Sequence, residues 1–458
     1  MSENHSNVGK SKIMKIINAA SAHVHFLGVG GVGMSALFRL SEYFGISASG
    51  SDASHGEYVD ALLNTGARVS ITSGECLPEN TTLLVYSLAV SENDPTLRKA
   101  RERGIVAVSR AEYLGAIMSC YEKCIGIAGS HGKSTVTAML SHIFSFGKKQ
   151  PTTLSGASLG IGGSQLQIGA LDYFICEACE YKDSFLHFPL DTCVFLNLEY
   201  DHVDYFHSFD SLKASFLSAM KGAGKSIVCS DDRALSELCD ELNRPLVTFG
   251  KKMGADYRYE ITSGKPRAMS FVLYYKNKPL GEVTLSLLGE FNVSNATAAI
   301  ACAMEHGIPF DDCRRALVDF RGIDRRLEVL GSLDGRRVYY DYAHHPTEIR
   351  EGIKAVKSDT GGKITLIFGA HTYSRTKALW NDFVRELREA DFVFLTEIAG
   401  IRESVIEGIT AEALASAIGA EVIESYSELV GKLRETEGAI IIMGARDMTE
   451  VKNLLINS

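Results

Sequence analysis

Residues 125–139 hold the groups best suited to binding a phosphate. An apolar run ends in the glycine-rich turn Gly129-Ser-His-Gly-Lys133-Ser134, and a helical pattern follows at once. Backbone N–H groups of such a loop point inward and bind phosphate oxygens. Lys133 would add a positive charge at the terminal phosphates, and the Ser134 hydroxyl would ligate Mg²⁺. The stretch predicts a nucleoside-triphosphate site, although Ile127 occupies the position of the first glycine in the strict Walker pattern.

A second glycine loop, Gly28-Val-Gly-Gly-Val-Gly33, lies near the N-terminus. It follows a buried-strand pattern at 23–27, and Asp52 stands about 20 residues further on. This is the dinucleotide fingerprint, in which glycines let the backbone approach a pyrophosphate and the acid accepts a hydrogen bond from a ribose or base. A UDP-sugar also contains a pyrophosphate, so the loop leaves a nicotinamide enzyme and a UDP-sugar enzyme both open. Ser87 follows the strand pattern at 83–85, where strand ends line the ligand crevice of such a sheet.

Acidic residues and a histidine follow two strand patterns downstream of the phosphate loop. Glu177 and Glu180 come after the pattern at 171–176, and His202 lies in the acidic stretch after 192–198. Oxygen ligands with one imidazole suit Mg²⁺ or Mn²⁺. Two such clusters after one phosphate loop favour a metal or substrate site over solvated strand ends.

The last third of the chain repeats this arrangement. Four strand patterns end in polar residues, which are Asp341 with His344 and His345, His371 with Arg375, Glu397, and Arg446 with Asp447. Because the carboxyl ends of parallel strands meet at one edge of a sheet, these residues predict a binding face. Asn292 and Asn295 precede a small-residue helix at 296–305, and the sequence favours a capping role for one of them while leaving base recognition open.

Composition limits the classes of function. The 458 residues are 45% hydrophobic and 22% charged, which suggests about three domains. A net charge of −9 without a long basic tract argues against nucleic acid or an anionic membrane as a partner. No apolar run approaches the roughly 20 residues that span a bilayer, and the polar N-terminus lacks the apolar region of a secretory signal. Ten scattered cysteines, including the pair Cys176 and Cys179 that we interpret as packing residues, predict a cytoplasmic protein.

Strand and helix patterns alternate through three α/β units. We expect an N-terminal Rossmann-like domain over 1–118, a central P-loop ATPase-type domain over 119–322 with added antiparallel strands, and a C-terminal Rossmann-like domain over 323–458. The antiparallel strands are predicted at 257–261, 269–275 and 283–287. Residues 1–20 and the Gly/Ser-rich stretch 151–163 are expected to be loose, and 322–324 to act as a hinge.

Nearly the whole chain resembles the Mur ligase family. The matching segments are GVGGVGMS, SGSD, GSHGKST, EACE…SF, NLEYDHVDYF, NVSNATAAI, RRLE, DYAHHPTEI and AHTYSRT. The resemblance implies an ATP-dependent ligase that joins L-alanine to the lactyl carboxylate of UDP-N-acetylmuramate through an acyl phosphate. It also implies two Mg²⁺ or Mn²⁺ ions and a monomer or homodimer.

The resemblance further implies roles for individual residues. The UDP-sugar would be bound by Gly28, Gly30, Gly31, Gly33, Met34, Ser35, Asp52 and Ser87. ATP would be bound by Gly129, Ser130, His131, Gly132, Lys133, Ser134, Thr135, Asn292, Asn295, Arg326 and Asp341. The metal ligands would be Ser134, Glu177 and His202, and the amino acid would meet His344, His345 and Arg375. Lys133, Glu177, His202 and Arg375 would carry the catalytic roles.

Four residues at three places depart from the family pattern. Ser134 replaces a more usual threonine and keeps its hydroxyl, Glu290-Phe291 replaces an Arg-His pair near the adenine, and Thr372 replaces an arginine. The last change leaves Arg375 with less help in holding an amino-acid carboxylate. Three alternatives stay open: a sister ligase that attaches a peptide or another amino acid, a nicotinamide-dependent oxidoreductase, and a non-catalytic nucleotide-binding module.

Overall fold

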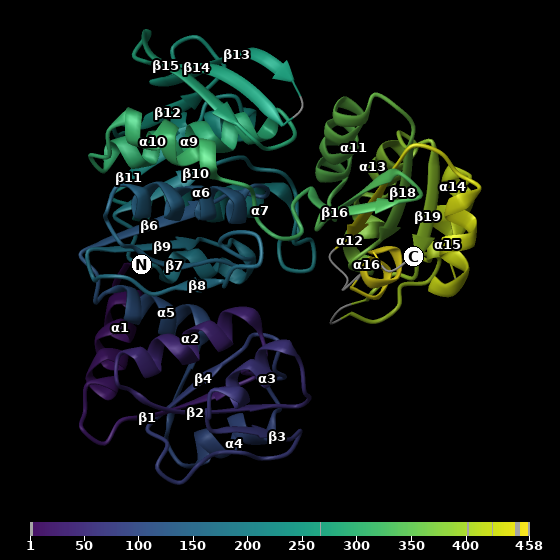
Figure 1. Ribbon diagram of the computed structural model, residues 1–458. Coiled ribbons are helices and arrows are strands. Elements are labelled where there is room, and N and C mark those ends of the chain that lie inside the picture. The colour runs from purple at the N-terminus through teal and green to yellow at the C-terminus, as the bar shows by residue number, and fades with distance from the viewer. Residues whose placement is uncertain (1–2, 266, 401–402, 424, 445–448, 457–458) are drawn as a thin grey trace.

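Three β-sheets organise the computed structural model of the chain (Figure 1). It describes residues 3–265, 267–400, 403–423, 425–444 and 449–456, so that Arg446 and Asp447 lie outside the described residues. The N-terminal and central sheets follow one another, and the C-terminal sheet lies to the side of the central one. Within these ranges, no helix has both the length and the apolar character needed to cross a membrane.

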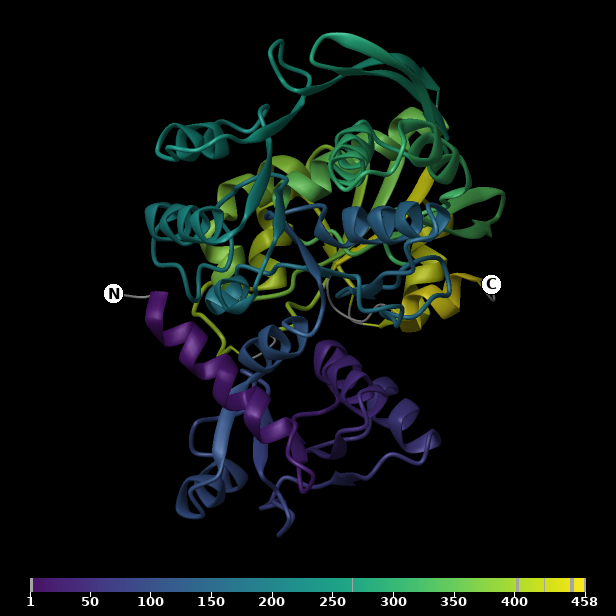
Figure 2. The same ribbon diagram turned by 90° about the vertical axis from the view of Figure 1, so that its left-hand side faces the viewer.

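The N-terminal sheet is wholly parallel, in the order β3-β2-β1-β4-β5. Its strands are β1 (His23–Leu27), β2 (Ser47–Asp52), β3 (Val69–Ile71), β4 (Leu83–Tyr86) and β5 (Val106–Ser109). Its helices are α1 (Glu3–Ile17), α2 (Val32–Tyr43), α3 (Glu57–Asn64), α4 (Pro95–Glu102) and α5 (Arg110–Met118). The prediction of a loose N-terminus is wrong, because Ile13 and Ile17 are buried on one side of α1, which lies along α5 (Figure 2).

The central sheet has ten strands in the order β15-β14-β13-β12-β11-β10-β6-β9-β7-β8. They are β6 (Lys123–Ala128), β7 (Thr152–Leu154), β8 (Leu166–Gln167), β9 (Tyr173–Glu177), β10 (Thr192–Phe195), β11 (Lys225–Cys229), β12 (Val247–Gly250), β13 (Tyr257–Lys265), β14 (Ala268–Tyr275) and β15 (Lys278–Leu285). The helices are α6 (Lys133–Phe146), η1 (Tyr181–His187), α7 (Phe209–Gly222), α8 (Arg233–Asp240), α9 (Phe291–Glu305) and α10 (Phe310–Asp319). The predicted antiparallel strands are present as β13, β14 and β15. All ten cysteines, including Cys176 and Cys179, are free.

The C-terminal sheet has the order β16-β17-β21-β18-β19-β20, and only the β16–β17 pair is antiparallel. Its strands are β16 (Glu328–Leu333), β17 (Arg336–Asp341), β18 (Ile364–Gly369), β19 (Phe392–Thr396), β20 (Glu421–Val422) and β21 (Ala439–Gly444). Its helices are α11 (Pro346–Thr360), α12 (Tyr373–Ala378), α13 (Trp380–Leu387), α14 (Ala411–Ile418), α15 (Tyr426–Arg434) and α16 (Thr449–Ile456). Separate apolar clusters pack on the sheet's two faces, as expected of parallel strands covered by helices.

The stretch 151–163 is also more ordered than predicted. It contains β7, and it then contacts the crossing between the central and C-terminal sheets. Ser158 Oγ accepts a hydrogen bond from Asp324 N at 2.9 Å, and Gly162 N donates to the Asp324 carboxylate at 2.8 Å. Polar contacts that join distant segments hold this loop, and its Gly/Ser composition alone does not reveal them.

Candidate active site

The phosphate loop joins the end of β6 to the start of α6. Gly132 has a positive φ of 85°, and a Cβ added there would lie 2.7 Å from Asn295 Oδ1, so only glycine fits. The end of β10 holds the loop from one side, because His131 N donates to Asn197 Oδ1 at 2.8 Å and Ser130 Oγ donates to the Glu199 carbonyl at 3.0 Å. Backbone groups of a loop fixed in this way are available to an anion without further ordering.

Lys133 forms an ion pair with Glu180. Its Nζ lies 3.1 and 3.2 Å from the two carboxylate oxygens, and it also donates to the Gly129 carbonyl. His202 Nε2 lies 3.6 Å from the same carboxylate. Burial opposes ionisation of Glu180, but Lys133 and His202 outweigh it and lower the pKa of Glu180 to about 2. Burial likewise opposes the charge on Lys133, and Glu180 raises its pKa.

No hydrogen bond or ion pair of the described residues joins Glu177 to His202. Glu177 accepts hydrogen bonds from Ser155 Oγ at 2.6 Å and Gly156 N at 2.5 Å, in the loop after β7, and its charge also helps to raise the pKa of Lys133. Glu177 is still paired in the sheet, opposite Ile127, whereas Glu180 follows the strand end and reaches the phosphate loop. Glu180 therefore belongs to the candidate site, although its place in the sequence gave it no specific role. In the described contacts, Ser134 Oγ has no hydrogen bond to either acid, although Ser134 is buried in the first turn of α6.

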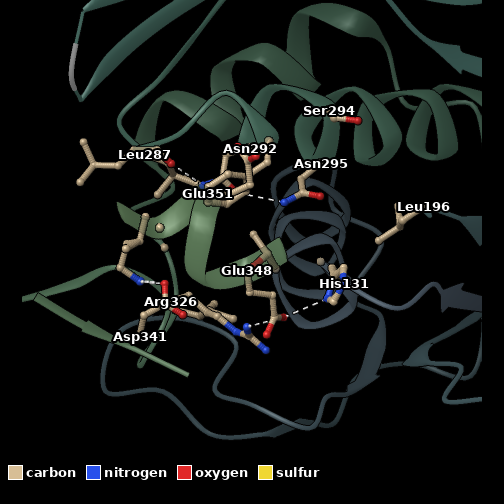
Figure 3. A pocket seen from close by; sticks show the side chains of 18 of the residues that line it. His131, Leu196, Leu287, Asn292, Ser294, Asn295, Arg326, Asp341, Glu348 and Glu351 are labelled. Carbon is tan, nitrogen blue, oxygen red and sulfur yellow. Dashed lines mark hydrogen bonds and ion pairs between the residues drawn. The ribbon is translucent and has the colours of Figure 1, made fainter. Parts of the chain in front are cut away.

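His131 lies between two carboxylates from different domains. Its Nδ1 is 3.2 Å from Glu348 Oε1 in α11, and its Nε2 is 3.4 Å from Glu199 Oε2 (Figure 3). Burial opposes protonation of His131, but Glu348 and Glu199 raise its pKa to about 9. Thr347 Oγ1 also donates to Glu199 Oε2, at 2.6 Å. These contacts join the phosphate loop to the C-terminal domain.

A cavity of about 690 Å³ opens beside this network, between the central and C-terminal domains. From the central domain it is lined by residues that include His131, Gly132, Thr135, Leu196, Leu287, Leu288, Phe291, Asn292 and Asn295 (Figure 3). From the C-terminal domain it is lined by residues that include Arg326, Leu327, Asp341, Thr347, Glu348 and Gly352. A charged end at the phosphate loop and an apolar end at α9 suit a nucleotide.

Neither predicted asparagine caps α9. Glu290 occupies the N-cap position, and its side chain makes no capping hydrogen bond. Asn292 Nδ2 instead donates to the Leu288 carbonyl at 2.7 Å, and Asn295 Nδ2 donates to Asn292 Oδ1 at 3.0 Å. Both are buried in the first turn and a half of α9 and line the cavity, because the helix starts before them, at Phe291.

Arg326 and Asp341 reach the cavity from the C-terminal domain. Arg326 Nη1 lies 3.5 Å from Glu348 Oε1, and its guanidinium lies 5.3 Å from the centre of the Tyr342 ring. Asp341 accepts from Leu327 N at 3.0 Å and from Ala343 N at 2.8 Å. Burial raises the pKa of Asp341 to about 6, although Arg326 opposes this shift.

The three residues predicted to meet the amino acid lie at the boundary with the central domain. Arg375 Nε donates to Asp201 Oδ1 at 2.8 Å, and both side chains are buried. His345 begins α11, where its Nδ1 accepts from Thr347 N at 3.3 Å. His344 Nδ1 is 2.9 Å from the Tyr342 carbonyl oxygen. Asp201, like Glu180, is an acidic residue of the candidate site to which the sequence gave no role. Glu199 and Glu348 are two more.

The N-terminal glycine loop contacts fewer charged groups than the phosphate loop does. Asp52 Oδ2 accepts a hydrogen bond from Gly30 N at 2.8 Å, so its carboxylate holds the loop itself. A Cβ added to Gly28 would lie 3.1 Å from Ser87 Cβ, and one added to Gly33 would lie 3.0 Å from Arg110 Nη1. Gly31 precedes α2, and Met34 and Ser35 are buried in its first turn. The predicted UDP-sugar residues thus share one end of the sheet.

A ladder of histidines and serines joins β1 to β2 behind this loop. His25 Nδ1 lies 2.9 Å from Ser49 Oγ, and its Nε2 lies 3.0 Å from Ser51 Oγ. The Ser51 carbonyl in turn accepts from Gly28 N at 2.8 Å. Burial lowers the pKa of His25 to about 4, so the ladder is neutral near pH 7.

Comparisons with known proteins cover the same three regions. Residues 23–122 match the model "Mur ligase family, catalytic domain", residues 127–303 match "Mur ligase middle domain", and residues 325–446 match "Mur ligase, glutamate ligase domain". A UDP-N-acetylmuramate–L-alanine ligase of Caldanaerobacter subterraneus is 34% identical over 440 residues, which cover 93% of this chain and 96% of that protein. One of Agathobacter rectalis is 35% identical over 450 residues, covering 95% and 98%.

Solved structures show the same fold. The UDP-N-acetylmuramate-alanine ligase of Thermotoga maritima matches with a TM-score of 0.80 at 23% identity, over 95% of this chain and 98% of that one. A murein peptide ligase of Psychrobacter arcticus matches with a TM-score of 0.72 at 22% identity, again over 95% and 98%. The fold is therefore shared by ligases whose names give different substrates.

Proposed function

The chain belongs to the Mur ligase family, and on that premise we propose that it joins L-alanine to the lactyl carboxylate of UDP-N-acetylmuramate while ATP is converted to ADP and phosphate. The reaction belongs to peptidoglycan precursor synthesis, and its proposed location is the cytoplasm. The observation that carries the proposal is the full-length match to curated alanine ligases, at 34% identity over 93% of this chain. The proposed domains are 1–118 for the UDP-sugar, 119–322 for ATP, and 323–458 for completing the ATP and amino-acid sites.

The chemistry explains why so many charges gather at one place. A carboxylate resists attack by an amine, because its leaving group would be oxide. Transfer of the γ-phosphoryl group to the lactyl carboxylate forms an acyl phosphate, and the neutral amine of the amino acid then attacks and releases phosphate. Carboxylate, triphosphate and amino-acid carboxylate must meet despite their like charges, so fixed positive groups supply the main stabilisation.

Lys133 is the proposed cation on the transferred phosphates. It lies in the first turn of α6, and its present partner is the buried Glu180 carboxylate at 3.1 Å. An arriving triphosphate can replace that carboxylate as the counter-charge. Gly132 keeps the loop open to the phosphates, and the cavity above it accommodates the nucleoside between Asn292, Asn295 and the C-terminal wall.

The residues beside Lys133 also fit a hard divalent cation. The Ser134 hydroxyl, the carboxylates of Glu177 and Glu180, and the His202 imidazole supply mainly oxygen ligands, as Mg²⁺ or Mn²⁺ prefers. When bound there, such ions would offset phosphate charge during transfer. We propose Ser134, Glu177 and His202 as ligands, with Glu180 added, and two ions per site.

The amino-acid site is proposed at Arg375, His344 and His345. Arg375 is buried against Asp201, so its guanidinium is fixed where two domains meet. A guanidinium in this position can bind the amino-acid carboxylate through its remaining N–H groups. The UDP-sugar is proposed to bind along Gly28–Ser35 with Asp52 and Ser87, and both monomer and homodimer are compatible with the proposal.

The main alternative is a sister ligase that attaches a peptide or another amino acid, because a murein peptide ligase shares the fold. The family matches leave the nicotinamide enzyme and the non-catalytic module without support. The test is phosphate release from ATP and Mg²⁺, with and without UDP-N-acetylmuramate, across L-alanine, glycine, L-serine and a tripeptide. Release that requires both the sugar nucleotide and L-alanine is expected. Phosphate release with the tripeptide as the only accepted amine would move the assignment to peptide attachment. If no pair of substrates releases phosphate, the ligase is refuted.

A further inference from the structure

One buried ion pair joins the central domain to the proposed amino-acid site. Asp201 lies in the loop after β10, and its Oδ1 accepts a hydrogen bond from Nε of Arg375, in α12 of the C-terminal domain, at 2.8 Å. The two side chains are 6% and 8% exposed, so solvent screens the pair little. Among the ion pairs of the described residues, Asp201 is the only acid that meets Arg375. A residue of another domain therefore sets the direction of this guanidinium.

The loop that carries Asp201 is held by its own hydrogen bonds. Asp201 Oδ1 also accepts from His202 N at 2.7 Å. The His202 carbonyl accepts from the N–H groups of Tyr205 and Phe206, each at 2.9 Å, and Tyr200 donates to the Phe206 carbonyl at 2.8 Å. His202 has a left-handed φ of 52°, which a non-glycine residue keeps only where its surroundings fix it. Asp201 is thus a rigid anchor.

Arg375, by contrast, stands on a short element. The helix α12 has six residues, and a long arginine side chain on such a helix has several rotamers open to it unless a partner selects one. Asp201 uses the Nε–H group, and Nη1 lies 3.4 Å from His371 Nδ1. The two terminal nitrogens keep N–H groups that can bind a carboxylate end-on, as a fork. Ordering Arg375 before the substrate arrives removes that entropic cost from binding.

We propose that Asp201 is a positioning residue for the amino-acid substrate, because it holds Arg375 with its terminal nitrogens directed at the substrate's carboxylate. Asp201 acts through Arg375 and does not itself contact the amino acid. The inference rests on the proposed ligase function and deepens it. The amino-acid site, assigned above to the C-terminal domain, is completed by a carboxylate of the central domain.

The test is a set of KM and kcat values from phosphate release, measured for each substrate in turn. Asp201→Asn keeps an oxygen that accepts from His202 N, but it removes the charge that holds Arg375. The KM for L-alanine should rise about tenfold or more, because a neutral amide holds a guanidinium less firmly than a carboxylate does. The KM values for ATP and UDP-N-acetylmuramate should stay within about threefold of the wild type. The kcat at saturating L-alanine should fall by less than that KM rises.

Two further variants separate position from charge and trace the effect to Arg375. Asp201→Glu keeps the charge but moves the carboxylate by one methylene, and it should also raise the KM for L-alanine. Arg375→Ala should raise this KM by itself. Adding Asp201→Asn to Arg375→Ala should raise it no further, because two residues that act through one contact are not additive.

A second ion pair between the same two domains supplies the matched control. Arg267 Nε, in the turn between β13 and β14, lies 3.3 Å from Asp359 Oδ2 in α11. Asp359→Asn should leave the KM for L-alanine within about twofold, because it weakens a domain contact without reaching Arg375. An equal rise of this KM in Asp359→Asn would assign the effect to domain contact in general and overturn the role of Asp201.

Three other results would also overturn the proposal: an unchanged L-alanine KM in both Asp201 variants, an equal rise of all three KM values in Asp201→Asn, or a further rise in the double variant. Circular dichroism checks folding, and if the single variants do not fold, the double variant decides, since it leaves no unpaired charge. If the wild type accepts another amino acid in place of L-alanine, that amino acid is used throughout, so the alanine assignment fails separately. A wild type that releases no phosphate with any amine refutes both.

Discussion

The two glycine loops look alike locally and differ in what surrounds them. Each follows a buried strand near the middle of its sheet, β1 or β6, and each opens a helix. The N-terminal loop is held by one carboxylate of its own domain, Asp52. The phosphate loop meets charged groups from two domains, with Glu180 and Glu199 on one side and Glu348 on the other. A local glycine pattern therefore predicts a loop, while the groups delivered by distant segments determine its chemistry.

The largest effect should come from removing the positive charge of the phosphate loop. Lys133→Ala is expected to lower kcat roughly a thousandfold or more, because the developing phosphate charge loses its fixed cation. Steady-state phosphate release measures it, and Lys221→Ala, at an exposed position of α7, is the matched control. A loss below about tenfold would remove Lys133 from its proposed role.

Acid should lower the stability of the N-terminal domain, where His25 is buried. Burial lowers the pKa of His25 from 6.5 to about 4, so between those values the unfolded chain takes up a proton that the folded chain does not. The free energy of unfolding therefore falls as the pH falls from 6.5 towards 4, by about 3 kcal/mol in total at 1.36 kcal/mol per pKa unit. Amide exchange of β1 at pH 7 and pH 5 measures the change, with β6 as internal reference. Equal protection of β1 at both values would contradict it.

Base, rather than acid, should lower the stability around the phosphate loop, where His131 is protonated near pH 7. The folded-state pKa of His131 is raised to about 9, so its contribution is complete below pH 6.5 and is lost as the pH rises through 9. We expect a loss of about 2 kcal/mol, typical of a hydrogen bond to a charged group. Amide exchange at the start of α11 between pH 7.5 and pH 10 should reveal it. His131→Gln should remove the pH dependence, and its persistence in that variant would assign it to another group.

The smallest effect is expected at Asp52. Asp52→Ala leaves Gly30 N without its partner and should weaken UDP-N-acetylmuramate binding about tenfold, which corresponds to about 1.4 kcal/mol. ATP affinity should not change. Asp52→Asn keeps an acceptor and should retain most of the binding, as calorimetry can determine. If Asn weakens binding as much as Ala does, the charge of Asp52 contacts the ligand directly.

The sequence predicted the strands better than it predicted their partners. The predicted strand 23–27 coincides with β1, because a short apolar run bounded by a glycine turn has few other solutions. The strand predicted at 283–287 is observed at Lys278–Leu285, since the turn after β14 is only two residues long and the strand then shifts register near Gly281. The helix α1 was not predicted, because it depends on burial against α5, a contact that the local sequence does not reveal.

Spacing along the chain indicates candidate site residues that are local, and it gives no sign of their partners from distant segments. Lys133 and Ser134 stand in one loop, and their proposed roles rest on the spacing of that loop. The pairing of Lys133 with Glu180 spans 47 residues, and that of Arg375 with Asp201 spans 174. A single sequence carries no signal for such pairs, because the acids at a strand end resemble ordinary solvated caps until the sheets are placed side by side.

The single chain crossing at 320–327 has a consequence for how the cavity forms. Its two walls belong to different domains, yet they are joined covalently and Asp324 is held by Ser158 and Gly162. Meeting of the walls is an intramolecular event, for which a short flexible connection gives an effective concentration of millimolar order. Completion of the cavity is therefore independent of how dilute the protein is, and each chain carries both walls of the cavity at any concentration at which it remains folded.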